Sequence, residues 1–312
     1  MPLALDEKVL QRIRQEDLDT LVDLDRRGLT PAPNEDADAF AARLQRLAER
    51  LSQWEDDLRT AGRTSLEGIT LKREDAIPAE LLAASGKRTK GLYGFQCDWV
   101  PGYFCSPSHS WLFGGCTFSA PPDLFTVFII SQKLRTKKRH LFYDRDEILS
   151  HELCHVARTG LQATEFEEHF AYQTSTGAFR RNWGGIMHSQ WDSFLFLALC
   201  LLLPIGQLVL PQFAPSLPLW LNWIPLLAAL AFFVLRHLRS RRHFQKALQT
   251  LQKYACHGDE QKARILLFHA TDQEIHVLAK LYGKANGETL FHQTLDSFPK
   301  DLRWKVAFHR TR

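Results

Sequence analysis

Two histidines and a glutamate lie close together in the segment His151-Glu152-Leu153-Cys154-His155. Residues four apart on an α-helix project from the same face, so these two imidazoles can bind one metal ion. Catalytic zinc takes three protein ligands and a water molecule, whose pKa falls to about 7. Glu152 is placed to accept the proton from that water and to pass it to a leaving group. The spacing therefore predicts a hydrolytic zinc site.

The helix that must carry these residues is well defined in the sequence. Asp144 can cap its start, and Glu147 follows at the spacing of a capping box. No residue that breaks a helix occurs between Asp144 and Arg158. The faces away from the histidines are apolar, which predicts packing against a core. Their residues are Ile148, Leu149, Leu153 and Val156.

The third zinc ligand should come from a second helix. Thr164 and Glu167 form another capping-box pair, and Gly160 permits a sharp turn between the two helices. The side chains expected near one face of the second helix are Glu165, Glu168, His169 and Tyr172. The candidates for the third ligand are Glu165, Glu167, Glu168 and His169.

The segment Glu168-His169-Phe170-Ala171-Tyr172 resembles the E-x-x-A-D helix of gluzincin metallopeptidases, with Tyr172 in place of the Asp. The resemblance implies a zincin-like α+β domain in which His151, His155 and Glu168 hold zinc. It also implies that the strand expected at 126–130 lines the cleft and pairs with an extended substrate. A buried central strand is the alternative. Tyr172 could donate a hydrogen bond to a zinc ligand or to the reacting oxyanion, or it could simply pack.

A long apolar segment follows the metal site. Between Asp192 and Arg236 there are 43 residues and no Asp, Glu, Lys, Arg or His. One bilayer crossing needs about 20 residues, so two transmembrane spans fit, at about 194–210 and 217–235, and a buried soluble hairpin is the alternative. Basic residues flank both outer ends, which predicts an inner-membrane protein with both termini and the metal site in the cytoplasm. The expected turn and interface residues are Pro211, Pro215, Pro218, Trp191, Trp220 and Trp223.

A metal motif combined with membrane spans is also similar to the integral-membrane metallopeptidases of the prenyl-protease and heat-shock kind. In those families the helix with the Glu ligand usually follows long after the HExxH helix. Here it precedes the hairpin, so we do not assign the chain to them. A joint at Gly184-Gly185 is expected to connect the metal site to the first span flexibly.

The predicted divisions of the chain are an N-terminal helical region (1–64), the zincin-like domain (65–190), the transmembrane hairpin (191–236) and a cytoplasmic helical region (237–312). In the first, a break at 28–33 separates two helices, the second running from Asn34 to near Gly62. Residues 65–132 are rich in Gly, Pro and aromatics, which predicts an irregular antiparallel sheet.

The last region should be helical from about 240 to 281, with a capping box at Thr271 and Glu274. The tail, 286–312, mixes aromatic and basic residues and is expected on the lipid surface. The basic run 133–140 is expected to be a solvated loop, with contact to anionic lipid as the alternative. Histidines expected at ordinary surface or core positions are His257, His269 and His276.

Composition narrows the choice of function. The net charge of +4 and the lack of a basic, aromatic groove pattern give no support for nucleic-acid binding. Six irregularly spaced cysteines predict reduced thiols, and the charged N-terminus predicts that the chain is not secreted. A second zinc site is conceivable at Cys97, Cys105 and Cys116.

The leading hypothesis is a membrane-anchored zinc metallopeptidase with Glu152 as general base, acting on protein or peptide substrates that include membrane proteins. Its partners would be the bilayer and the substrate. The sequence does not indicate an oligomeric state. The alternative is a membrane scaffold or sensor with a structural zinc ion. Hydrolysis of a non-peptide amide or a lipid-linked substrate by the same chemistry is a third possibility.

Overall fold

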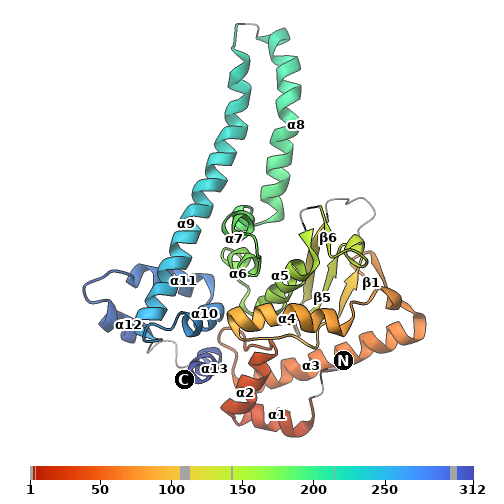
Figure 1. Ribbon diagram of the computed structural model, residues 1–312, viewed down its shortest axis with the longest axis vertical. Helices are drawn as coiled ribbons and strands as arrows, with labels where there is room; N and C mark the ends of the chain where they lie inside the picture. The colour runs from red at the N-terminus through yellow and green to blue at the C-terminus, as the bar shows by residue number, and fades with distance from the viewer. Residues whose placement is uncertain (1–2, 4, 106–112, 142, 215, 296–300) are drawn as a thin grey trace.

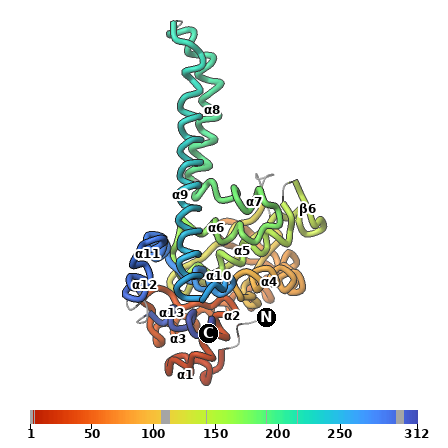
Figure 2. The backbone as a smooth tube through the Cα atoms, turned by 60° about the vertical axis from the view of Figure 1, so that its left-hand side comes forward, coloured from red at the N-terminus to blue at the C-terminus, as the bar shows by residue number. Residues whose placement is uncertain are grey.

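The computed structural model describes the chain from residue 3 to residue 312, apart from positions 4, 106–112, 142, 215 and 296–300. Two long helices project together from a body of shorter helices and a small sheet (Figure 1). The turned view shows that this hairpin leaves the body at one end (Figure 2). The predicted turn residue Pro215 lies outside the described residues.

The N-terminal region is helical, as predicted, but contains three helices. They are α1 (Glu7–Arg14), α2 (Leu18–Arg26) and α3 (Ala37–Ala61). The first predicted helix is divided at Glu16, which has a positive φ of 54°. Asp36, rather than Asn34, caps α3 by accepting a hydrogen bond from the Ala39 N–H. Gly62 ends α3 in the left-handed conformation, as expected for a glycine after a helix.

The sheet next to the metal helix is mixed, so the prediction of an antiparallel sheet was wrong in part. Its order is β3-β5-β4, with β3 parallel and β4 antiparallel to β5. The predicted strand at 126–130 is the fully buried central strand β5, because β3 and β4 cover both of its edges. The edge strand beside the metal helix is β4. The strands are β3 (Gly102–Phe104), β4 (Gly115–Ala120) and β5 (Phe125–Ile130).

A helix of 15 residues, α4 (Ala79–Tyr93), lies inside the stretch that was predicted as sheet. The sequence does contain its signals: Pro78 precedes it, Glu80 lies in its first turn and Gly94 follows it with a positive φ of 75°. The aromatic and glycine-rich sequences on either side obscured these signals. Shorter elements nearby are β1 (Arg63–Leu66), β2 (Ile69–Lys72), η1 (Arg73–Asp75), η2 (Gln132–Leu134), β6 (Arg139–His140) and β7 (Tyr143–Asp144).

The basic run that includes η2 and β6 is exposed but partly paired. Arg135 contacts Asp75 at 2.7 Å and Lys138 contacts Asp146 at 3.4 Å. Arg139 contacts the helix-capping Asp144 at 3.2 Å. These ion pairs connect the run to the start of the metal helix.

The projecting hairpin consists of α8 (Gln190–Phe213), the short η5 (Leu219–Trp223) and α9 (Ile224–Tyr254). Both helices are long and apolar enough to cross a membrane. Most of the exposed large apolar side chains of the described chain lie on them. Pro211 lies inside α8 rather than in the turn. Asp192 and Arg236 form an ion pair at the base of the hairpin.

Helix α9 does not end with the apolar segment. It continues without a break to Tyr254, so the predicted boundary at 236/237 lies inside one helix. Its C-terminal half packs against α10 (Glu260–Phe268) and α11 (Asp272–Leu281). The predicted capping box of Thr271 and Glu274 is present at the start of α11.

The C-terminal tail packs into the body, so its predicted position on a lipid surface was wrong. It forms α12 (Gly287–Leu295) and α13 (Leu302–Thr311). Trp304 and Val306 of α13 are fully buried, and α13 packs against α2. The buried Arg303 pairs with Glu274 of α11 at 2.8 Å. The amphipathic sequence of α13 therefore reflects a core-facing side.

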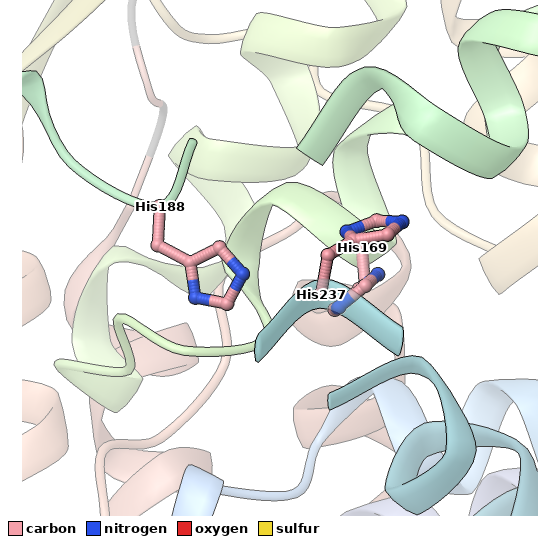
Figure 3. Close-up of side chains that lie close together, drawn as sticks. All are labelled: His169, His188 and His237. Carbon is pink, nitrogen blue, oxygen red and sulfur yellow. The ribbon is translucent and has the colours of Figure 1, made fainter. Parts of the chain in front are cut away.

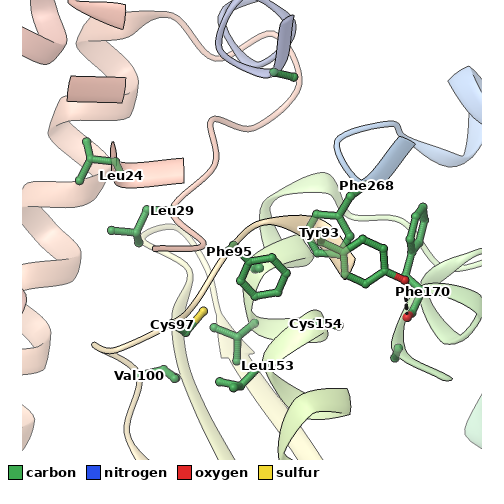
Figure 4. Packing of buried hydrophobic residues seen from close by; sticks show 14 of the residues in the cluster. Leu24, Leu29, Tyr93, Phe95, Cys97, Val100, Leu153, Cys154, Phe170 and Phe268 are labelled. Atoms are coloured by element: carbon green, nitrogen blue, oxygen red, sulfur yellow. Dashed lines mark hydrogen bonds between the residues drawn. The ribbon is translucent and has the colours of Figure 1, made fainter. Parts of the chain in front are cut away.

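An aromatic cluster joins the C-terminal helices to α4 and to the segment that carries Phe170 (Figure 4). Tyr93 of α4 stacks on Phe268 of α10, with ring centroids 4.4 Å apart. The Tyr93 hydroxyl donates a 2.8 Å hydrogen bond to the carbonyl of Phe170. Because the same hydrophobic cluster contains residues from the N-terminal, middle and C-terminal regions, these regions share one core.

Candidate metal centre

The two histidines of the HELCH segment lie on α5 (Arg145–Arg158), as predicted. Asp144 caps this helix by accepting hydrogen bonds from the N–H groups of Asp146 and Glu147. The predicted capping box does not form, because the Glu147 carboxylate bonds elsewhere. It accepts a 2.7 Å bond from the Thr176 N–H and pairs with Arg180 at 3.0 Å. Glu147 thereby connects α5 to the segment after the second metal helix. The predicted apolar residues Ile148, Leu149, Leu153 and Val156 are all buried.

The second helix of the cluster, α6 (Glu167–Tyr172), begins two residues later than predicted, with Phe166 rather than Thr164 at its N-cap position. No side chain of the described residues caps it. Asp272 of α11 instead holds the segment before α6, because its carboxylate accepts hydrogen bonds from three successive N–H groups, those of 164–166. The turn before α6 includes η3 (Thr159–Leu161), and the left-handed residue there is Gln162 rather than Gly160. A partner more than 100 positions away in the sequence thus fixes the start of α6.

His151, His155 and Glu168 come together across α5 and α6. The Nε2 atoms of the two histidines are 3.2 Å apart. Each Nε2 lies 3.5 Å from a carboxylate oxygen of Glu168. Two imidazole nitrogens bound to one tetrahedral zinc ion at about 2.0–2.1 Å are about 3.3 Å apart. The donor set and its spacing therefore fit a zinc ion.

The alternative third ligands point away from this cluster. Glu165 lies outside α6 and contacts His276 at 2.8 Å. The ring of His169 contacts the Ser240 hydroxyl at 2.6 Å. Glu167 contacts Nδ1 of His155 at 3.5 Å, on the side of the ring opposite Glu168. Of the four side chains expected near one face of α6, Glu165 and His169 therefore lie away from the cluster, and Glu168 faces both histidines.

Arg158 and Glu167 support the outer side of the cluster. Arg158, whose side chain is fully buried, donates a 2.7 Å hydrogen bond to Glu167. It also bonds the carbonyls of Phe268 and Ala270. A carboxylate behind a metal-binding histidine fixes the orientation of the ring. Glu167 is placed for this role toward His155, and its own position depends on the C-terminal helices.

Tyr172 and two glycines pack on the other side of the cluster. The ring of Tyr172 lies edge-on to His151, with centroids 4.7 Å apart. A Cβ added to Gly184 would lie 2.2 Å from Tyr172 Cδ1, and one added to Gly185 would lie 3.1 Å from Glu168 Cβ. The segment η4 (Gly184–Ile186) is thus a close backbone contact with α6, and the expected flexible joint is a packed one. The remaining helix of this region is α7 (Ala178–Trp183).

Glu152 lines the same cavity as His151, His155 and Glu168. The cavity measures about 400 Å³ and is bounded by the edge strand β4. The Thr117 hydroxyl of β4 donates a 2.6 Å hydrogen bond to Glu152. A Cβ at Gly115 would lie 2.6 Å from Glu152 Oε1, so only glycine leaves room for this carboxylate. Sequence reasoning missed Thr117 and Gly115, because their pairing with Glu152 depends on the register of β4.

Burial and neighbouring charges perturb the acid–base groups of the site. Burial raises the pKa of Glu152 to about 7, although His155 and the Thr117 hydrogen bond oppose this shift. Burial lowers the pKa of His151, and the neighbouring His155 adds to the effect. Burial also acts to lower the pKa of His155, but the contact with Glu167 and the charges of Glu168 and Glu152 outweigh it and raise the pKa to about 9. The opposite shifts make His155, rather than His151, the imidazole that holds a proton near neutral pH, and a bound cation would displace that proton.

Two further groups of possible metal ligands occur in the described part of the chain. One is His169, His188 and His237, and the other is Glu165, His243 and His276. Neither contains a cysteine, and the predicted second site at Cys97, Cys105 and Cys116 does not form a group of this kind among the described residues. A larger cavity of about 580 Å³ lies between α3, α4 and β3, but no histidine lines it. The chemistry of the site therefore belongs to the smaller cavity.

Comparison of the chain with protein-family models, with curated proteins and with solved structures gives no match.

Proposed function

We propose that the protein is a membrane-anchored, zinc-dependent peptidase with Glu152 as its general base. One observation carries this proposal. The carboxylate of Glu152 shares a cavity with the three-residue cluster of His151, His155 and Glu168 but is not one of its members. A structural zinc site usually has four protein ligands, whereas a catalytic one leaves a position open beside a general base.

Each residue of the site would have a separate role in the proposed hydrolysis. Zinc bound by the cluster would supply an acidic water and polarise the carbonyl under attack. Glu152, positioned by Thr117, would take up the proton of the attacking water and deliver it to the leaving amine. Tyr172 packs on His151 and supports the position of that ring. The edge strand β4 offers its free side to an extended chain, which favours a peptide over a compact substrate.

The hairpin supports the membrane part of the proposal. Exposed apolar side chains on α8 and α9 form a surface that water would solvate poorly, and lipid would cover it. Arg180 and Arg181 precede the hairpin, and Arg236, Arg239, Arg241 and Arg242 follow the apolar segment. The turn between the helices has no charged residue, so both ends of the hairpin belong in the cytoplasm. The substrates would then be proteins or peptides at the cytoplasmic face, membrane proteins among them.

The test is the isosteric substitution Glu152→Gln in the full-length chain, reconstituted in lipid and loaded with zinc. A library of fluorogenic peptides and an unfolded protein serve as substrates. Loss of a general base should lower turnover by at least about 100-fold, while zinc bound at the cluster stays the same. Glu80→Gln, at an exposed position of α4, is the matched control and should behave as the wild type.

Two results would count against this function. Equal cleavage by the wild type and Glu152→Gln would show that this glutamate is not the general base. Zinc bound in a wild type that cleaves nothing, with no output altered by Glu152→Gln, would instead support a structural ion in a membrane scaffold.

A further inference from the structure

A second cluster of two histidines and one carboxylate lies where the segment just before α6 meets α9 and α11. His243 comes from α9, His276 from α11 and Glu165 from the segment just before α6. One ligand atom from each lies within 4.8 Å of the others. Nε2 of His276 is 2.8 Å from the carboxylate of Glu165. Three segments that are distant in the sequence therefore present a zinc-type donor set at one point.

The two imidazoles of this cluster repeat the arrangement of the first. The rings of His243 and His276 have centroids 4.9 Å apart and planes at 79°. For His151 and His155 the corresponding values are 4.8 Å and 77°. The first pair owes its geometry to helical spacing, whereas the second pair comes from two helices. Packing of α9 against α11 has therefore produced a similar arrangement of two imidazole rings by a different route.

One histidine of the second cluster also lacks a protein partner where it is buried. Nδ1 of His243 is inaccessible to solvent and makes no hydrogen bond within the described chain. A buried polar atom without a partner is costly, and coordination of a metal would satisfy it. The charged and titratable groups near His243 are His276, Arg239 and Lys246, together with the carboxylate of Glu165.

The remaining histidine cluster, His169, His188 and His237 (Figure 3), is a poorer site because two of its three histidines already use ring nitrogens in hydrogen bonds, although Nε2 of His188, like Nδ1 of His243, has no partner in the described chain. Nδ1 and Nε2 of His237 contact the carbonyls of Gly185 and Asn182, at 3.1 and 2.7 Å. Nε2 of His169 contacts the Ser240 hydroxyl at 2.6 Å. A metal would have to break these contacts to bind.

We propose that Glu165, His243 and His276 form a second zinc site that connects three segments of the chain. The ion would connect α9, which continues from the membrane hairpin, to the segment that leads into α6. It would act together with Asp272, which holds that segment from the same helix as His276. This site is independent of the peptidase activity proposed above.

The experiment is zinc analysis of the full-length protein in detergent, after loading with zinc and removal of weakly bound metal with a mild chelator. The wild type should hold two zinc ions per chain. His243→Ala, His276→Ala and the isosteric Glu165→Gln should each hold one, because loss of a ligand should weaken binding by more than about 100-fold. His292→Ala, at an exposed position, and His188→Ala, in the other cluster, should still hold two.

Combination with His151→Ala separates the two proposals. A single zinc ion in the wild type that is lost in His151→Ala and kept in His276→Ala would overturn the second site and leave the first. A single ion with the opposite behaviour would support the second site and overturn the first. Loss of one ion in His188→Ala, but not in His276→Ala, would place the second ion in the cluster of His169, His188 and His237 and would overturn the proposal. The zinc kept in His276→Ala also shows that the variant has folded.

Discussion

The cluster of His151, His155 and Glu168 and the cluster of Glu165, His243 and His276 contain the same residue types and similar ring arrangements, but their surroundings differ. The first opens into a cavity of about 400 Å³ that Glu152 also lines. The second joins three segments that are distant in the sequence. One donor set can thus arise from helical spacing or from the packing of separate helices, and only its surroundings can indicate what a bound ion would do.

The two clusters are also physically connected. Glu165 and Glu168 are three residues apart, and Asp272 holds the segment between them from α11. A change at the second cluster can therefore reach the first through the position of α6. Substitutions that affect one cluster and spare the other test how strong this connection is.

The largest effect, on the free energy of unfolding, is expected from a third histidine–carboxylate pair, His269 and Asp25, which should bind no metal. His269 is fully buried, and its ring nitrogens contact Ile265 O and Asp25 Oδ1, both at 2.7 Å. Asp25 also pairs with Arg310. Asp25→Asn should leave a buried charge uncompensated and lower the free energy of unfolding by about 3–5 kcal/mol, measured by denaturant titration in detergent. Zinc content should not change, and a lost zinc ion would mean that this pair belongs to a metal site.

Asp25 also makes the stability of the folded protein depend on pH. Burial acts to raise the pKa of Asp25, but the charges of His269 and Arg310 outweigh it and hold the pKa well below its usual range. As the pH falls below about 4, the unfolded chain takes up this proton before the folded one. Acid should therefore destabilise the wild type, and Asp25→Asn should lack this part of the dependence.

Glu168→Gln should separate the two zinc clusters most clearly. The substitution keeps the shape of the side chain but removes the charge that faces His151 and His155 at 3.5 Å. Zinc affinity at the first cluster should fall by more than about 100-fold, while the second cluster keeps its ion. Titration with a competing chromophoric chelator measures both sites. Retention of both ions would move the third ligand to Glu167, for which Glu167→Gln is the matched variant.

Sequence reasoning succeeded where the chemistry is local. The i, i+4 spacing of His151 and His155 predicted their shared face, and the two segments that form α5 and α6 were predicted as helices from capping pairs and side-chain spacing. The contact of Asp272 with the segment before α6 was not predicted, because Asp272 lies more than 100 residues away and no pattern near Thr164 points to it. His276 was interpreted as an ordinary histidine for the same reason, since its cluster exists only when α9 packs against α11.

The sheet and the C-terminal tail also show that local sequence patterns predict elements but not the partners against which they pack. The strand at 126–130 was predicted correctly as an element, but its central position depends on which strands pair with it. The amphipathic α13 has the pattern of a helix that covers an apolar surface. That pattern does not state whether the surface is lipid or protein, and here it is the core beside α2. Helix α4 is different, because Pro78 and Gly94 marked it and a closer reading could have found it.

Thr117→Val should affect chemistry at the first cluster and leave both zinc ions in place. The Thr117 hydroxyl donates a 2.6 Å hydrogen bond to Glu152, and valine has a similar shape without the donor. Loss of a hydrogen bond to a charged group is worth about 1.5–3 kcal/mol, so turnover should fall by about 10- to 100-fold. Steady-state kinetics on a cleaved peptide measure the effect, and Thr126→Val on the same sheet is the control. Unchanged turnover would mean that Glu152 does not depend on β4 for its position.

Asp272→Asn tests the connection between the clusters and should have the smallest effect. The carboxylate of Asp272 accepts hydrogen bonds from the N–H groups of Thr164 and Glu165 at 2.7 and 2.8 Å. An asparagine can still accept one such bond, but without the charge, so the cost should be about 1 kcal/mol. Because the N–H of the ligand Glu165 makes one of these bonds, zinc affinity at the second cluster should fall by about fivefold, measured by chelator competition. The first cluster should change less, since Arg158 and Glu167 hold His155 from the other side. An equal loss at both clusters would show that α6 moves as one unit and that the second zinc ion controls the position of Glu168.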